Sequence, residues 1–96
     1  MVELLKKLFG IGPSADLKGI YKSGGQIIDV RTKGEYASGH IKGSVNIPLD
    51  SLKSNLSKIN KNKPVITCCA SGMRSASAKS ILSSSGFNEV YNGGGW

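Results

Sequence analysis

Residues 64–75 read Pro64-Val65-Ile66-Thr67-Cys68-Cys69-Ala70-Ser71-Gly72-Met73-Arg74-Ser75, and this stretch decides the fold. Its first five residues are rich in β-branched side chains and predict a buried strand. A helix is predicted to follow from about residue 73 to residue 85, and Gly86 is typical of the residue that ends a helix. Open α/β sheets bind ligands beyond the carboxyl ends of their strands, so the loop between this strand and helix is a candidate site.

The rest of the chain alternates strands and helices in the same way. Short apolar runs predict three further strands, at residues 26–30, 44–47 and 89–91. Helical patterns predict three further helices, from Ser14 to Gly24, from Lys33 to Ser38 and from Asp50 to Ile59. Strands that alternate with helices favour an α/β domain whose parallel sheet is covered by helices on both faces.

The chain is expected to form one domain over residues 14–96, preceded by an amphipathic helix and linker over residues 1–13. Four apolar side chains share one face of that helix: Val2, Leu5, Leu8 and Phe9. This face would lie either on a membrane surface or against the domain, and packing on the domain is favoured because so short a helix binds lipid weakly. The sequence has no stretch that predicts a membrane span and no signal-peptide pattern, so we expect a cytoplasmic protein with reduced thiols.

The chain is strongly basic, with 13 Lys and Arg against 6 Asp and Glu and a formal charge of +7. The lysines are scattered between Lys6 and Lys79 and form no basic stripe interleaved with aromatic residues. Nucleic-acid binding is therefore disfavoured. A positive field of this kind is better suited to attracting small anionic substrates and acidic partners.

The only two cysteines of the sequence, Cys68 and Cys69, are adjacent. Neighbouring residues of a strand point to opposite faces, so these two are badly placed to form a disulfide with each other. A zinc site needs about four ligands, which two adjacent cysteines and the single histidine do not supply. We therefore expect no metal and no cofactor, and we expect at least one thiol to be either buried or reactive.

Cys69 has the surroundings of a reactive thiolate. It is predicted to lie where a strand ends and a helix begins, so free backbone N–H groups and the helix dipole favour a negative charge there. The small residues Ala70, Ser71 and Gly72 allow the backbone to curl closely around a ligand, and Arg74 adds a full positive charge. These features predict Cys69 as the nucleophile and Cys68 as a buried structural neighbour.

The loop is accompanied by a second set of motifs upstream. These are Ile28-Asp29-Val30-Arg31, Glu35-Tyr36, Gly39-His40-Ile41, Gly43 and Asn46-Ile47-Pro48, and the chain ends in a glycine triplet before Trp96. Together with Cys69-Ala70-Ser71-Gly72-Met73-Arg74-Ser75, they resemble the single-domain rhodaneses, which are thiosulfate sulfurtransferases. The resemblance covers nearly all of residues 14–96.

This resemblance implies a doubly wound α/β domain with a central parallel sheet of about five strands and helices on both faces. It also implies an enzyme that moves a sulfane sulfur from thiosulfate or a persulfide donor to a thiol or cyanide, through a persulfide on Cys69. Carried over to this sequence, the substrate-binding cradle consists of Ala70, Ser71, Gly72, Met73 and Arg74. Asp29, Arg31 and Glu35 would hold the scaffold, and His40 would lie in a structural turn.

One residue of the loop departs from several thiosulfate-using members of this family, because position 70 is Ala where they carry Arg. The loop is less cationic as a result, so a donor other than thiosulfate is also open. The acceptor would be a thiol such as thioredoxin, glutathione or a sulfur-carrier protein. We expect the protein to act as a monomer.

Two other functions fit parts of the sequence. A Cys-dependent phosphatase or arsenate reductase would use Cys68, since five residues then separate the nucleophile from Arg74. Such phosphatases tend to place His before the nucleophile, whereas position 67 is Thr, and the shorter loop from Cys69 is the length typical of a sulfurtransferase. A non-enzymatic rhodanese-like module, for binding or for sulfur relay, is the other alternative.

Overall fold

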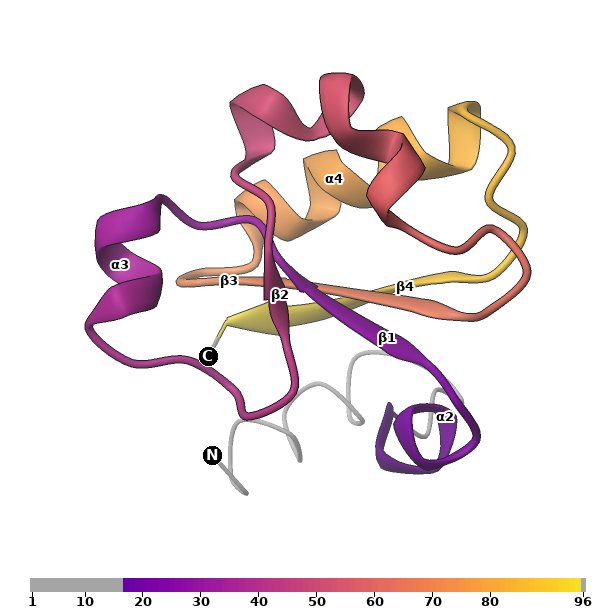
Figure 1. Cartoon of the computed structure of the whole chain (residues 1–96), viewed down its shortest axis with the longest axis horizontal. Coiled ribbons are helices and arrows are strands. Elements are labelled where there is room, and N and C mark those ends of the chain that lie inside the picture. Colours follow the sequence, from indigo (N-terminus) through magenta and orange to yellow (C-terminus); the bar gives the residue numbers. More distant parts are fainter. Residues whose placement is uncertain (1–16, 96) are drawn as a thin grey trace.

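The computed structural model describes residues 17–95, and Figure 1 shows the order of its elements. The helices are α2 (Leu17–Lys22), α3 (Lys33–Ala37), the 3-10 helix η1 (Leu49–Lys58) and α4 (Met73–Ser84). The strands are β1 (Gln26–Asp29), β2 (Val45–Asn46), β3 (Val65–Cys69) and β4 (Val90–Gly95). The predicted N-terminal helix and linker over residues 1–13 lie outside the described residues.

The strands of the described part form one parallel sheet in the order β2-β1-β3-β4. This confirms the predicted α/β class. The sheet of residues 17–95 has four strands rather than the five or so that the family resemblance implied. Four is also the number of strand-forming apolar runs in the sequence, and each of the four predicted runs contributes one strand.

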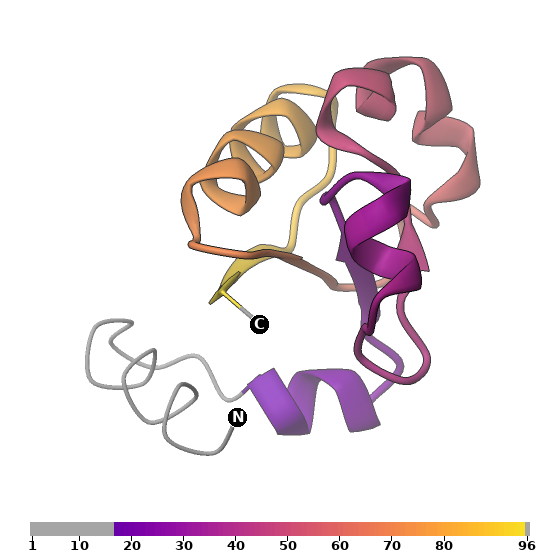
Figure 2. The ribbon, with the colours of Figure 1, turned by 90° about the vertical axis from the view of Figure 1, so that its left-hand side faces the viewer.

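Helices cover both faces of the sheet, as predicted. Figures 1 and 2 show η1 and α4 on one face and α2 on the other. The larger core lies on the side of η1 and α4 and includes Ile28, Leu52, Val65 and Leu82. The smaller core lies on the side of α2 and consists of Leu17, Ile27, Ile66 and Cys68.

Strand β3 is buried along its whole length, and its side chains alternate between these two cores. Val65 and Cys69 belong to the larger core, whereas Ile66 and Cys68 belong to the smaller one. The two adjacent cysteines therefore face opposite sides of the sheet, which confirms the prediction made from strand geometry. Both are free thiols.

The helix predicted between Asp50 and Ile59 forms, but as a kinked 3-10 helix. Asn55 has non-helical backbone angles (φ −125°, ψ 22°), and its side-chain Nδ2 donates to the carbonyl oxygen of Ser51 at 2.7 Å. An Asn side chain that bonds to its own backbone competes with regular helix geometry. Leu52 and Ile59 are nevertheless buried in the larger core, and the partly buried Leu56 packs against it.

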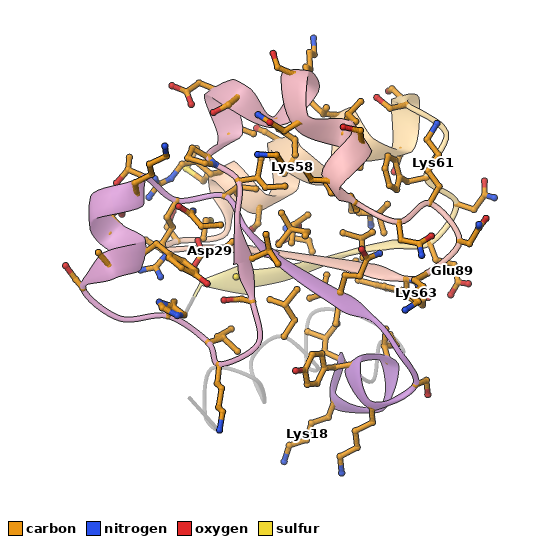
Figure 3. The ribbon with its side chains drawn as sticks, viewed as in Figure 1. Lys18, Asp29, Lys58, Lys61, Lys63 and Glu89 are labelled. Carbon is orange, nitrogen blue, oxygen red and sulfur yellow. The ribbon has the colours of Figure 1, made fainter. Side chains whose placement is uncertain are left out.

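The lysines of the described residues do not form a single patch. Figure 3 shows Lys18 projecting from α2 on one side of the sheet, whereas Lys61 lies on the other side, after η1. Lys61 Nζ lies 5.6 Å from the centre of the Phe87 ring, as in a cation–π contact. Within residues 17–95, lysines therefore lie on both sides of the sheet.

Candidate active site

Cys69 is the last residue of β3, and its sulfur lies at the N-terminus of α4. The backbone N–H groups of Gly72 and Ser75 donate to Sγ at 2.9 and 3.3 Å. Gly72 is the N-cap of α4, and it lacks a side chain that could accept the free N–H groups of the first turn. The sulfur of Cys69 accepts from this turn instead, which is a suitable position for a negative charge.

Gly72 makes this close approach possible through its backbone conformation. Its φ of +96° lies in the left-handed region, which strongly favours glycine over other residues. The chain reverses direction at this turn between β3 and α4. The N–H of Gly72 then points back to the sulfur of Cys69, three residues earlier in the sequence. The loop predicted from small residues is thus a tight reversal around one sulfur atom.

A hydroxyl completes the set of groups around the sulfur. Ser75 Oγ lies 3.4 Å from Cys69 Sγ, so the thiol can donate to it and a thiolate can accept from it. The backbone of Ser75 is held in turn by Thr67 Oγ1, which donates to its carbonyl oxygen at 2.8 Å. The side chains of Thr67, Cys69 and Ser75 are all inaccessible to solvent.

The pKa of Cys69 is lower than that of an ordinary thiol. Burial acts to raise it, but hydrogen bonds from the Ser75 hydroxyl and from the N–H groups of Ser75, Gly72 and Ser71 outweigh that effect. The thiolate is the nucleophilic form of cysteine. The geometry of the loop therefore favours the thiolate form of Cys69.

Cys68 has the opposite character. Burial is the main reason that the pKa of its thiol rises to about 12, and the nearby Asp29 adds to the effect. It is 3% exposed and lies on the α2 side of the sheet, where it lines an apolar pocket of about 210 Å³ with Leu17, Ile27 and Ile66. Cys68 therefore remains a protonated, buried thiol away from the loop.

Arg74 is engaged by an acidic residue from another helix. Its Nη1 and Nη2 donate to Oε1 and Oε2 of Glu35 at 2.7 and 3.0 Å, so α4 is tied to α3 by a bidentate ion pair. The hydrogen bond from Arg74 is the main cause that lowers the pKa of Glu35 to about 2. The positive charge predicted for the cradle is thus present at the helix N-terminus, but its guanidinium binds Glu35.

The remaining predicted loop residues form the rim of the site. Ala70 and Ser71 are exposed, and the side chain of Met73 is 78% exposed. They leave the sulfur buried at the bottom of the loop with small or flexible side chains around it.

The upstream motif forms the scaffold beside the loop. Arg31 makes a buried ion pair with Asp29, with Nη2 2.8 Å from Oδ2, and the same Nη2 donates to the carbonyl oxygen of Gly39 at 2.7 Å. Glu35 and Thr32 form a reciprocal capping box at the start of α3. His40 stacks on Tyr36 with ring centres 3.7 Å apart. The capping box fixes the start of α3, from which Glu35 reaches Arg74.

Strand β4 passes so close to the loop that it requires glycine. A Cβ on Gly95 would lie 2.5 Å from the carbonyl oxygen of Ala70, and a Cβ on Gly93 would lie 2.8 Å from that of Thr67. The sequence placed the last strand over residues 89–91 and treated the glycines as a closing segment. The strand in fact continues to Gly95, because pairing with β3 decides its extent.

The sequence did not single out Ser75 or Asn92, although both lie in the hydrogen-bond network of the sulfur. Ser75 Oγ donates to Oδ1 of Asn92, a residue of β4, at 2.6 Å. A signal for Ser75 was available, since it is the third residue of a helix whose N-terminus carries the nucleophile. For Asn92 no local pattern indicates the contact, because it depends on how β4 pairs.

The described residues thus form a parallel α/β sheet with a cysteine sulfur at the N-terminus of a helix. In residues 17–95 no helix is long and apolar enough to cross a membrane, and no three His, Cys, Asp or Glu side chains gather as a metal site would need. The rhodanese-like domain family matches residues 14–96. The chain belongs to the rhodanese family.

Individual relatives agree with this assignment. The chain is 43% identical over 67 residues to the uncharacterized protein YqhL of Bacillus subtilis, covering 70% of this chain but only 53% of that one. It is 40% identical over 70 residues to the thiosulfate sulfurtransferase PspE of Escherichia coli, covering 71% of this chain and 67% of PspE. A solved E. coli structure, described as rhodanese with anions, matches with a TM-score of 0.70 and 38% identity, over 74% of this chain and 86% of that one.

Proposed function

We propose that this protein is a sulfurtransferase that carries sulfur as a persulfide on Cys69. The observation that supports this most directly is the set of donors around one buried sulfur: the N–H groups of Gly72 and Ser75 and the hydroxyl of Ser75. These groups stabilise a thiolate before the reaction. They are also placed to stabilise the negative charge of a persulfide afterwards.

The reaction would proceed in two displacements. The Cys69 thiolate attacks the sulfane sulfur of the donor, a new S–S bond forms, and the donor's own bond to that sulfur breaks. With thiosulfate the leaving group is sulfite, and with a persulfide it is a thiolate. An acceptor thiolate or cyanide then attacks the outer sulfur and takes it, which releases the Cys69 thiolate. No net oxidation occurs, and no cofactor takes part.

The rim of the loop favours a donor that does not depend on a second positive charge. Position 70 is Ala and is exposed, and the guanidinium of Arg74 binds Glu35. A persulfide carried on a small thiol or a protein would therefore suit the site at least as well as free thiosulfate. The acceptor we propose is likewise a thiol, in a compartment reducing enough to keep both cysteines free.

Mass spectrometry of the protein after incubation with a donor tests the proposal. We expect a gain of one sulfur atom on the peptide that contains Cys69, with thiosulfate or with glutathione persulfide, and loss of that sulfur when cyanide or dithiothreitol is added. Cys69→Ser should abolish the gain, and Cys68→Ser should leave it unchanged. No adduct with any donor would refute persulfide transfer.

The same pair of variants tests the phosphatase and arsenate-reductase alternative. That reaction needs Cys68 as the nucleophile, but Cys68 faces the α2 core and its pKa is raised to about 12. Turnover of p-nitrophenyl phosphate or arsenate that survives Cys69→Ser and is lost in Cys68→Ser would favour the alternative. We expect neither substrate to be turned over.

A further inference from the structure

The side-chain amide of Asn92 contacts two of the groups that hold the sulfur of Cys69. Its Oδ1 accepts from Ser75 Oγ at 2.6 Å, and its Nδ2 lies 3.4 Å from the carbonyl oxygen of Gly72. The backbone N–H of Gly94 donates to Oδ1 at 2.8 Å. Because a backbone N–H can only donate, this bond fixes which end of the amide faces Ser75. Ser75 is therefore the donor in its contact with Asn92.

The hydroxyl of Ser75 has one hydrogen and more than one acceptor in reach. Asn92 Oδ1 is the nearest, at 2.6 Å, and the carbonyl oxygen of Gly72 follows at 3.0 Å. That carbonyl also accepts from the N–H of Ala76 at 3.1 Å, so it does not depend on Ser75. When Cys69 is a neutral thiol, its S–H donates to Ser75 Oγ, and Ser75 donates to Asn92.

Loss of the proton from Cys69 changes the hydrogen bond that the Ser75 hydroxyl can make with the sulfur. A thiolate cannot donate, so the lone pairs of Ser75 Oγ would face a negative sulfur at 3.4 Å. The hydroxyl of Ser75 stabilises the thiolate only if its hydrogen turns from Asn92 to Sγ, and this turn gives up the shortest of the hydroxyl's contacts. The two acceptors exclude each other because there is only one hydrogen.

We propose that Asn92 is a positioning residue that competes with the sulfur of Cys69 for the hydroxyl proton of Ser75, and so weakens the stabilisation of the Cys69 thiolate in the resting site. The inference deepens the proposed function, since it concerns the same sulfur and the form in which it waits for a donor. Ser75 then turns to the sulfur when negative charge develops there.

Asn92 is uncharged, so its effect on Cys69 can be separated from those of the ionisable groups around the site. In the described residues these include Asp29 at the end of β1, Arg31 after it, Glu35 on α3, Asp50 on η1, Cys68 on β3, Arg74 on α4 and Tyr91 on β4. Arg74 interacts electrostatically with Cys69 and is paired with Glu35, and the Tyr91 hydroxyl is directed to Glu89. A substitution of Asn92 leaves all of them in place.

The test is the rate of alkylation of Cys69 by iodoacetamide as a function of pH, with the modified peptide identified by mass spectrometry. Asn92→Leu has a similar shape but offers no acceptor. We expect it to lower the apparent pKa of Cys69 by about half a pH unit, which means roughly threefold more thiolate below that pKa. Ser75→Ala should raise the apparent pKa. In the Ser75→Ala background, Asn92→Leu should have no further effect.

The sign of the change separates competition from simple support of the loop. If Asn92 only held the loop in shape, Asn92→Leu would displace the donors and raise the pKa of Cys69, and that result would overturn the proposal. An equal decrease with and without Ser75 would overturn it as well. Because iodoacetamide involves no sulfur transfer, these outcomes are independent of whether Cys69 carries a persulfide.

A measurement on the unmodified protein covers the case in which Asn92→Leu does not fold. The side-chain ¹³Cγ and ¹⁵Nδ2 resonances of Asn92 should titrate with the pKa of Cys69, since Oδ1 loses the Ser75 hydrogen bond on ionisation. The titration should be absent in Ser75→Ala, which keeps Asn92. Asn92 resonances that stay constant while Cys69 ionises would contradict the competition.

Discussion

Gly95→Ala should disturb the cysteine loop from the outside, without changing any group that touches the sulfur. The new Cβ would lie 2.5 Å from the carbonyl oxygen of Ala70 and 3.2 Å from its carbonyl carbon. Cβ atoms essentially never approach closer than 3.0 Å, so β4 or the loop has to move by at least about 0.5 Å. Both contacts are to backbone atoms, so no side chain can rotate to relieve them.

Gly95→Ala should affect both the stability of the domain and the pKa of Cys69, and the size of each effect can be estimated. Overpacking of this kind costs about 1–3 kcal/mol of stability, which lowers the melting temperature by several degrees in a domain of this size. The displaced residues are Ala70 and Ser71, and the N–H groups of Ser71, Gly72 and Ser75 lower the pKa of Cys69 by hydrogen bonding to its sulfur. A hydrogen bond to a charged group contributes about 1.5–3 kcal/mol, so weakening one such bond should raise the pKa of Cys69 by about one unit.

The assay combines thermal unfolding with the pH profile of Cys69 alkylation, and two glycine variants serve as controls. Gly93→Ala places its Cβ 2.8 Å from the carbonyl oxygen of Thr67 and 2.9 Å from Cγ2 of Ile66, within the body of the sheet. It should lower the melting temperature without moving the pKa of Cys69. Gly34→Ala meets open space in helix α3 and should be neutral or stabilising by up to about 1 kcal/mol. The reasoning is refuted if Gly95→Ala keeps the wild-type pKa of Cys69, or if Gly93→Ala shifts it equally.

Three further substitutions test the scaffold around the site. Glu35→Gln should make stability less dependent on pH in acid. The pKa of Glu35 is lowered from 4.5 to about 2, chiefly by the hydrogen bond from Arg74. The ionised Glu35 therefore contributes its full stabilisation above pH 4.5, and this stabilisation is lost as the pH falls through 2. The difference in urea midpoint between wild type and variant should therefore shrink towards pH 2, and a difference that is constant with pH would contradict this. Asp29→Asn removes the carboxylate that pairs with the buried guanidinium of Arg31. It should lower the free energy of unfolding, measured in urea, by about 3–5 kcal/mol. A decrease below about 1 kcal/mol would show that the ion pair is dispensable. Leu82→Ala should lower the free energy of unfolding in urea by about 2–5 kcal/mol. It should leave the pKa of Cys69 unchanged, because Leu82 lies in the core two helical turns away from the loop. A shifted pKa would show that core packing determines the ionisation of Cys69.

The position of Cys69 between a strand and a helix could be predicted from the sequence because local rules decide it. A β-branched run, three small residues and a helical segment give a strand, a loop and a helix whose bounds differ from the prediction by one residue at most. The separation of Cys68 from Cys69 follows from the two-residue repeat of a strand. Neither conclusion needs knowledge of any distant part of the chain.

The partners of the loop could not be predicted in this way, because they come from elements far apart in the sequence. Arg74 was expected to complete the cradle, yet Glu35, 39 positions earlier, binds its guanidinium. Asn92 reaches Ser75 only because β4 pairs with β3 and its glycines let the two strands approach. Strand propensity alone would have ended β4 before those glycines, since glycine is depleted in strands.

The length of the loop and the identity of Ser75 are best understood as one feature. With Gly72 as N-cap, Ser75 is the third residue of α4, and both its N–H and its hydroxyl lie within hydrogen-bond distance of Cys69 Sγ. One additional residue before Ser75 would rotate it by about 100° around the helix axis and turn its hydroxyl away from the sulfur. A loop that starts at Cys68 contains that additional residue, but the side chain of Cys68 lies on the opposite face of the sheet. The short register from Cys69 is therefore the one in which the strand, the loop and the helix all direct their polar groups to the same sulfur.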